Sequence, residues 1–281
     1  MSAGRGIAFF VASQACLVVE GSVVHHLGTT LAMDQLTLAR GVGLAVLIAV
    51  LARGEGLAVF RTTQLPLQFL RNGLSVVSLW LIFYSFAHLP LADASTLAYL
   101  RPVFVTLLAV LLLREVVGGR RWTATLLGLA GALVVLGPGF GAWHPAYGAA
   151  VAGAALNAAA LVFSRRLAAT DRPVTVMAWL ALLSILCSAG ALWRPWPWEV
   201  WPALMAVAAS GALGLFFGQV AVKFADVSLL APYDYVRLPM LMVVGLVVFL
   251  QVPSPTTLLG SALILLSAGV LFLRESHTTR R

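Results

Sequence analysis

Apolar residues run along almost the whole chain in long blocks, and short connections rich in polar residues, glycine or proline separate these blocks. A helix needs about 20 predominantly apolar residues to cross the hydrocarbon core of a bilayer. The pattern therefore predicts an all-α polytopic membrane protein with ten transmembrane helices. The predicted spans are residues 6–25, 34–52, 66–87, 92–113, 121–139, 146–164, 173–192, 201–222, 227–250 and 255–273.

Two short motifs recur at nearly the same spacing and divide this pattern into halves. The sequence ADAS at 92–95 returns as ADVS at 225–228, and TLLG at 125–128 returns 132 residues later. Each half contains five predicted spans, an odd number, so the second half enters the membrane from the opposite side. We therefore predict two inverted five-helix repeats, residues 1–140 and 141–281, with a substrate site at their interface.

The composition excludes a soluble protein. Of the 281 residues 61% are hydrophobic and 10% are charged, and the mean hydropathy is +0.98, whereas a soluble domain carries roughly 25% charged residues. The first apolar block follows only MSAGRG and shows no clear small-residue cleavage site, so we expect it to remain as a helix. Cys16 and Cys187 lie inside predicted spans without metal-ligand spacing, and we predict neither a metal site nor another cofactor.

The basic residues are distributed unevenly between the predicted loops. If the N-terminus is cytoplasmic, the inner loops and helix ends hold 14 of the 18 Lys and Arg residues, and the outer side holds only Arg194. This bias predicts cytoplasmic N- and C-termini in a bacterial-type inner (plasma) membrane. The net charge of +8 thus points to the lipid bilayer as the partner of the basic residues, and we predict no nucleic-acid partner.

Arg101, Asp234 and Arg237 lie in the middle of stretches that are apolar enough to cross a membrane. A charge at mid-bilayer costs from a few to about 10 kcal/mol unless it has a partner or water. Under the repeat, Arg101 corresponds to Asp234, so these two residues pair with each other, or Asp234 pairs with Arg237 three residues along its own helix. We predict that the three residues line a solute pathway, and the alternative is a static ion pair that only holds the bundle together.

Several residues of intermediate polarity add to this candidate site. Ser78 belongs to a polar stripe on the predicted helix 66–87, and Trp80 and Tyr84 form a second face of that helix. Tyr99 and Tyr235 add aromatic groups with hydroxyls near the predicted depth of the charges. An apolar pocket with a few polar groups is typical of a small-molecule site, although ordinary helix packing explains any one of these aromatic residues.

Three acidic residues have other candidate roles. Glu20 lies towards the outer end of its predicted span, where it either carries a proton coupled to transport or reaches the membrane interface. Asp93 and Asp226 each begin a span, and we predict that their carboxylates cap free backbone N–H groups there.

Prolines predict irregular helices next to the charged residues. Pro102, Pro232 and Pro239 cannot donate to a helical ladder, so each frees a backbone carbonyl. Freed carbonyls are tolerated in a membrane where neighbouring groups or cavity water satisfy them. The spans 92–113 and 227–250 are therefore predicted to be kinked and to face a cavity, with a kink for packing alone as the alternative.

Residues 89–139 resemble the EamA-type proteins of the drug/metabolite transporter superfamily. The matching features are the alanine-rich entry to the span at 92, Pro102, the Arg114-Glu115 helix exit, Trp122 and the glycine-rich span that follows. The second half resembles the same pattern more faintly and has Gln251-Val252-Pro253 where an acidic exit is expected. The resemblance implies a ten-helix transporter with inverted repeats and a central cavity, whose relatives export amino acids and other metabolites or import molecules such as riboflavin.

We therefore expect a secondary transporter of small organic metabolites that works by alternating access. Amino-acid export, including aromatic amino acids, is the first expectation for its substrate. The alternatives are an importer of a vitamin or nucleoside-like metabolite such as riboflavin, or a channel. We do not expect an enzyme, because the sequence has no GxSxG nucleophile elbow, no HExxH metal site and no Gly-rich phosphate loop.

Overall fold

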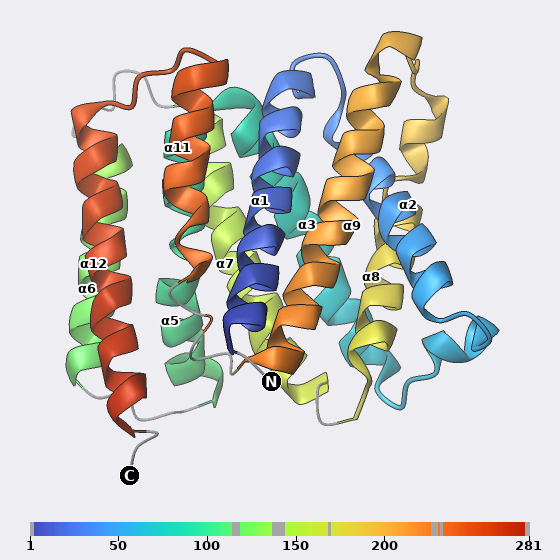
Figure 1. Cartoon of the computed structure of the whole chain (residues 1–281), viewed down its shortest axis with the longest axis horizontal. Coiled ribbons are helices and arrows are strands. Elements are labelled where there is room, and N and C mark those ends of the chain that lie inside the picture. The colour runs from blue at the N-terminus through green and yellow to red at the C-terminus, as the bar shows by residue number, and fades with distance from the viewer. Residues whose placement is uncertain are drawn as a thin grey trace.

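Figure 1 shows the computed structural model, which describes residues 3–113, 119–136, 144–167, 170–225, 230 and 233–278. These described residues form helices and connections, and none of them lies in a strand. The Arg114-Glu115 exit, the ADVS motif from Asp226 to Ser228 and Pro232 lie outside the described residues. The helices are α1 (Ala3–Leu27), α2 (Met33–Leu51), η1 (Gly56–Phe60), α3 (Leu65–His88), α4 (Leu91–Ala98), α5 (Arg101–Leu113), α6 (Gly119–Leu136), α7 (Pro145–Leu167), α8 (Pro173–Cys187), η3 (Ala189–Trp193), η4 (Trp198–Val200), α9 (Trp201–Phe224), α11 (Arg237–Val248) and α12 (Pro255–Thr278).

The helices have the length and surface of a multi-pass membrane protein. Six helical segments of the described chain are long and apolar enough to cross a bilayer, and four shorter apolar helices accompany them. Each of the ten predicted spans overlaps one of these segments, whereas the number of crossings remains a prediction. Large apolar side chains also point outward, including Val46, Leu133, Met205 and Leu266, which are each about 60% exposed or more. Lipid chains would cover such a surface, whereas water would not favour it.

In the two predicted halves, α1 corresponds to α7, α2 to α8, α3 to α9 and α6 to α12. The contacts between helices agree with this correspondence. α1 packs along α9, and the corresponding helices α7 and α3 pack along each other in the same way. Likewise α2 contacts α9 and α8 contacts α3, while α2–α8 and α6–α12 each join two counterpart helices. In Figure 1, α1 begins and α12 ends at the same end of the bundle.

The predicted span 92–113 is interrupted rather than continuous. α4 ends at Ala98, and α5 begins at Arg101 directly before Pro102. Pro102 has no N–H to donate to the backbone oxygen of Ala98, four residues earlier, and its ring clashes with that oxygen in a continuous helix, so the helix ends at Ala98 and a new one begins after Tyr99 and Leu100. The predicted irregularity at Pro102 is therefore confirmed, as a full break rather than a kink.

A second break lies in the second half. Tyr235 and Val236 form a turn, α11 begins at Arg237, and Pro239 falls in the first turn of this helix. Figure 1 shows that α5 and α11 both begin near the middle of the bundle rather than at its ends. Two charged residues of the predicted site, Arg101 and Arg237, are thus the first residues of the two interrupted helices.

Small residues let the helices around these breaks approach closely. A Cβ atom added to Gly153 of α7 would lie 2.9 Å from a side-chain carbon of Ile82 on α3, and one added to Gly43 of α2 would overlap the backbone of Ala208 on α9. Close backbone approach through small residues is the usual way in which membrane helices associate. The breaks are therefore held between tightly packed neighbouring helices.

Candidate functional site

Two adjoining cavities lie among the central helices. Their volumes are about 330 and 140 Å³, and they share six lining residues. The shared residues are Leu17, Ile82, Phe86, Arg101, Asn157 and Arg237. The larger cavity has the size of a small-molecule site and combines apolar walls with a few polar groups, as such sites do.

The smaller cavity contains the charge pair predicted from the repeat. Arg101 Nη2 lies 3.1 Å from Asp234 Oδ2, and the two side chains are 42% and 31% exposed. Gln14 Nε2 donates to the other carboxylate oxygen at 3.1 Å, and the Tyr99 hydroxyl donates to the backbone oxygen of Asp234 at 2.6 Å. Of the two predicted pairings, the structure forms Arg101–Asp234, and the described residues contain no ion pair between Asp234 and Arg237.

The larger cavity contains a second, more deeply buried ion pair. Arg40 Nη1 on α2 donates to both carboxylate oxygens of Glu20 on α1, at 2.8 and 2.9 Å. The Glu20 side chain is only 3% exposed and that of Arg40 is 15% exposed. Of the two roles predicted for Glu20, a position at the membrane interface is wrong, because the carboxylate turns inward to Arg40. A role in proton coupling remains a prediction.

Two further arginines line the cavities without a carboxylate partner among the described residues. Arg71 donates from Nε to Ser164 Oγ at 2.8 Å and from Nη1 to the side-chain oxygen of Asn72. The guanidinium of Arg237 lies 5.9 Å from the centroid of the Phe86 ring, and its buried Nε has no hydrogen-bond partner there. Four guanidinium groups and two carboxylates therefore line the two cavities, which leaves a formal excess of two positive charges.

The structure brings part of the predicted aromatic group to this site. Tyr99 lines the smaller cavity, and its ring stacks on Tyr235 with centroids 5.2 Å apart. The hydroxyl of Tyr99 is committed to the backbone of Asp234. The aromatic pair therefore supports the turn that precedes α11 and places one phenol ring at the cavity wall.

The other part of the prediction differs from the structure. Ser78, Trp80 and Tyr84 are not among the residues that line either cavity. The cavity side of α3 instead presents Arg71, Ser75, Leu79, Ile82, Phe83 and Phe86. Residues of a helix point in directions 100° apart, so Trp80 and Tyr84 lie about 160° around α3 from Ile82 and face away from the cavity, whereas Ser78, about 40° from Ile82, lies at the edge of the cavity side.

The contacts of these three residues show where they point instead. Ser78 Oγ donates to the backbone oxygen of Gly153 on α7 at 2.8 Å, and Tyr84 stacks against His88 and His144 near the end of α3. Trp80 Nε1 is buried without a hydrogen-bond partner in the described chain. Ser78 and Tyr84 therefore serve helix packing in this conformation.

Asp93 does not cap the helix that it begins. α4 starts at Leu91, and its N-cap position is occupied by Pro90. The buried carboxylate of Asp93 instead accepts hydrogen bonds from the Tyr147 hydroxyl on α7, at 2.9 Å, and from Thr257 Oγ1 on α12. The predicted capping role is wrong because these two hydroxyls reach the carboxylate from neighbouring helices, so Asp93 links α4 to α7 and α12.

A chain of hydrogen bonds closes the same end of the bundle. His25 Nδ1 on α1 contacts the backbone oxygen of Phe86, which only accepts hydrogen bonds, so Nδ1 carries a proton. His25 Nε2 then accepts from Gln251 Nε2 at 2.8 Å, and Gln251 Oε1 accepts from the backbone N–H of Leu91 at 3.1 Å. These contacts join α1, α3, α4 and the α11–α12 connection.

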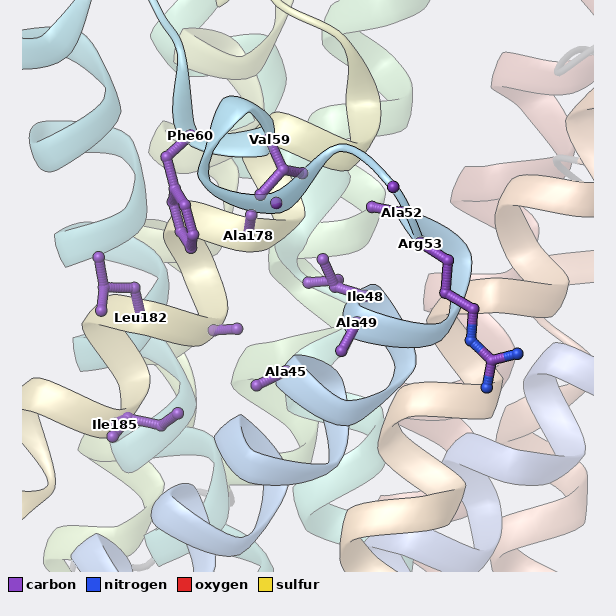
Figure 2. Close-up of a pocket in the computed structure, with 13 residues that line it drawn as sticks. Ala45, Ile48, Ala49, Ala52, Arg53, Val59, Phe60, Ala178, Leu182 and Ile185 are labelled. Carbon is purple, nitrogen blue, oxygen red and sulfur yellow. The ribbon is translucent and has the colours of Figure 1, made fainter.

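A separate pocket between α2, η1 and α8 has a different character. Figure 2 shows its lining, which is apolar except for Arg53 and includes Ile48, Phe60 and Leu182. The guanidinium of Arg53 lies to one side, away from Phe60 and Leu182 (Figure 2). With no convergent polar groups to orient a solute, this pocket of about 380 Å³ is a poorer substrate site than the charged cavities.

Arg40 is the main residue of the site that sequence reasoning missed. It lies inside a predicted span, as Arg101 does, and this position was the signal that could have identified it. Its partner Glu20 is on another helix, so no spacing along the chain revealed the pair. No group of three or more His, Cys, Asp or Glu side chains in the described part of the chain is arranged to hold a metal ion.

Comparison with known proteins gives one consistent result. The family model described as "EamA-like transporter family" matches residues 4–137. The chain is 30% identical to a riboflavin transporter of Vibrio cholerae over 258 residues, which cover 90% of this chain and 85% of that protein. It is 23% identical to an S-adenosylmethionine uptake transporter of Rickettsia conorii, over 98% of this chain and 95% of that protein, and 27% identical to the pseudopaline exporter CntI of Pseudomonas aeruginosa, over 73% and 74%. A crystal structure of a further protein with 27% identity superposes with a TM-score of 0.63 and covers 96% of this chain and 95% of that one.

Proposed function

The chain belongs to the EamA-like transporter family of membrane transporters for small metabolites, and from this premise we propose that it is a secondary carrier with the charged central cavities as its substrate site. In this proposal the carrier works by alternating access between its two halves. Solute binds beside Arg101, Asp234 and Arg237, where two helices are interrupted.

The observation that carries the proposal is the Arg101–Asp234 pair at the two helix breaks. Its residues line the smaller cavity, and each comes from a different predicted half. Interrupted helices near the midplane are typical of transporter substrate sites, because their free backbone groups and charges face a cavity. A pair that only held the bundle together would not need a cavity on its exposed side.

The packing of the helices supports alternating access. The pairs α1–α9 and α7–α3 exchange when the predicted halves are exchanged, as do α2–α9 and α8–α3. A structure with this property has a second conformation of similar packing, in which the two halves exchange roles. We therefore propose residues 1–140 and 141–281 as inverted repeats that open the cavities to one side of the membrane at a time.

Two substrates are candidates for the first assays. The relatives at 30% identity are named riboflavin transporters, which favours uptake of a flavin or a similar metabolite. Amino-acid export, including aromatic amino acids, is the second candidate, and the Tyr99–Tyr235 stack at the cavity favours it. Both molecules combine an aromatic part with polar groups, as the lining of the cavities does.

Solute flux into proteoliposomes tests the proposal. We expect saturable uptake of at least one member of a panel of riboflavin, S-adenosylmethionine and aromatic amino acids, and accelerated exchange when unlabelled solute is present on the opposite side. Counterflow separates a carrier from a channel. Flux that stays linear with concentration and shows no counterflow would indicate a channel instead, and no flux of any solute by folded protein would contradict the proposed function.

A further inference from the structure

The charged cavities have more positive charge than their own carboxylates compensate. Glu20 neutralises Arg40, and Asp234 neutralises Arg101. Arg71 and Arg237 face the same space without an ion pair of their own in the described chain: Arg71 donates to Ser164 and Asn72, and Arg237 lies over the Phe86 ring, with Glu20 near enough to interact with it electrostatically but not bonded to it. An unpaired guanidinium inside a membrane protein is costly, so a solute that brings negative charge would stabilise this arrangement.

The carboxylates of the site are held by several contacts each, which leaves the two free arginines to the solute. Asp234 accepts from Gln14 as well as from Arg101, and Glu20 receives both of its contacts from Arg40. Neither carboxylate forms an ion pair with Arg71 or Arg237 in the described chain. A guanidinium presents several N–H donors in a plane that matches carboxylate and phosphate groups.

The rest of the lining restricts the body of such a solute. The walls between the charged groups are apolar and include Leu17, Leu79, Ile82, Phe83 and Phe86. The combined site therefore fits an apolar or aromatic body with acidic groups at its ends. The breaks before α5 and α11 line the smaller cavity, and the beginning of a helix carries partial positive charge that adds to this preference.

We infer that the substrate class of this site is an organic anion, bound through one or two carboxylate or phosphate groups by Arg71 and Arg237. This inference rests on the proposed function and names the chemistry of its solute. It predicts that a neutral molecule of the same shape binds more weakly. It also predicts that a zwitterionic amino acid binds more weakly than the corresponding acid without the amino group.

Matched pairs of probes test the inference on the purified full chain in lipid nanodiscs. The first pair is riboflavin and riboflavin 5′-phosphate, and the second is isophthalate and isophthalamide. Thermal shift and tryptophan quenching measure their binding. We expect the anionic member of each pair to bind about tenfold more tightly or better, as charge-assisted hydrogen bonds to arginine require.

The variants Arg71→Gln and Arg237→Gln should each weaken binding of the anionic probes by about tenfold and weaken binding of the neutral probes less, so that the difference within each pair shrinks. Arg237→Lys keeps the charge and should retain most of the preference. Arg61→Gln is the matched control, because Arg61 is exposed in the connection between η1 and α3 and makes no ion pair in the described chain.

Three results would overturn the inference: equal binding of both members of each pair, a preference for the anion that survives both glutamine variants, or no binding of any probe by folded protein. Flux measurements separate this failure from failure of the proposed function. Saturable counterflow of a neutral or cationic solute that the anionic probes do not inhibit would retain the carrier and reject its assignment to organic anions.

Discussion

At the scale of single residues, the Arg101–Asp234 pair matters through its position more than through its contribution to stability. Its side chains are 42% and 31% exposed towards the cavity, and partly exposed ion pairs contribute little, about 0 to 1 kcal/mol. The pair nevertheless joins the two predicted halves at the point where α5 and α11 begin. In the proposed function, a solute that enters the cavity meets both partners, so replacing either would change what the solute binds.

Double-mutant cycles test this pair. We expect Arg101→Ala and Asp234→Ala each to reduce flux by about tenfold, and the double variant to lose less than the product of the two single losses, because paired residues are not additive. Flux in proteoliposomes at matched protein amounts measures this effect. The cycle of Asp234 with Arg237 should show no coupling; coupling there with none between 101 and 234 would contradict the observed pairing.

Gly211 offers a change of shape that leaves every charge in place. A Cβ at this position of α9 would lie 2.5 Å from Glu20 Oε1 and 3.2 Å from Arg40 Cγ. We expect Gly211→Ala to displace the Glu20–Arg40 pair and to lower flux at least about fivefold, since a buried pair depends on good geometry. Gly73→Ala on α3 is the control, because its Cβ would meet nothing within 4 Å. Equal flux in the two variants would show that the position of the pair is unimportant.

Sequence alone predicted those ion pairs of the candidate site that the predicted repeat relates. The predicted repeat relates Arg101 to Asp234, which made their contact one of two pairings expected for Asp234, and the structure forms that one. The Glu20–Arg40 pair was not predictable in this way, because it joins two helices of the same predicted half. Trp80 and Tyr84 were expected at the cavity but lie on the opposite side of α3, since spacing fixes the angles between side chains but not the rotation of the whole helix relative to its neighbours. Ser78 lies at the edge of the cavity side, where its hydroxyl donates to Gly153 instead.

At the scale of elements, two interrupted helices and one closed end define the site. Prolines predict such breaks, because the missing N–H is a property of the residue itself, and the break before α5 follows from Pro102. The closure by His25, Gln251 and Leu91 does not follow from any single residue. It joins residues far apart in the chain, and Gln251 looked only like a departure from the family pattern.

Replacing Gln251 should loosen this closed end. Gln251→Leu removes the hydrogen bonds to Leu91 and His25, each worth about 1 kcal/mol. In this variant we expect a cysteine introduced at Leu17, which lines both cavities, to react faster than in the unchanged protein. The reagent is a membrane-impermeant maleimide added on the side of the membrane that the His25–Gln251–Leu91 end faces, and the expected increase in rate is about fivefold.

This measurement uses a background in which Cys16 and Cys187 are replaced by alanine. Val252→Leu is the control, because Val252 is 80% exposed next to Gln251 and keeps an apolar side chain. An unchanged labelling rate in Gln251→Leu would show that the hydrogen-bond chain does not limit access to the cavities from this end.

At the scale of the whole molecule, the outward apolar side chains and the long helices describe a protein surrounded by lipid. Composition and block length predicted this class directly. The placement of α1 and α12, which begin and end at the same end of the bundle (Figure 1), agrees with an even number of crossings. Which side of the membrane that end faces depends on the distribution of the basic residues.

Accessibility of introduced cysteines tests this orientation. Because the inner loops collect the basic residues, we expect a cysteine at Leu57, which is 85% exposed between α2 and α3, to react only from the cytoplasmic side. A cysteine at Pro197, between η3 and η4, should react only from the outside. Intact cells and inverted vesicles give the two measurements, and labelling of position 57 in intact cells would reverse the predicted topology.

In the proposed carrier, the excess of positive charge in the cavities would also determine the response to membrane voltage. Each elementary charge that crosses a potential of 100 mV gains or loses about 2.3 kcal/mol. With four guanidinium groups and two carboxylates around an empty site, any displacement of the site relative to the field changes the energy of the conformations. A doubly negative solute would cancel this charge, so the loaded carrier would change conformation almost independently of voltage. The return of the empty carrier would then be the step that the potential accelerates or slows.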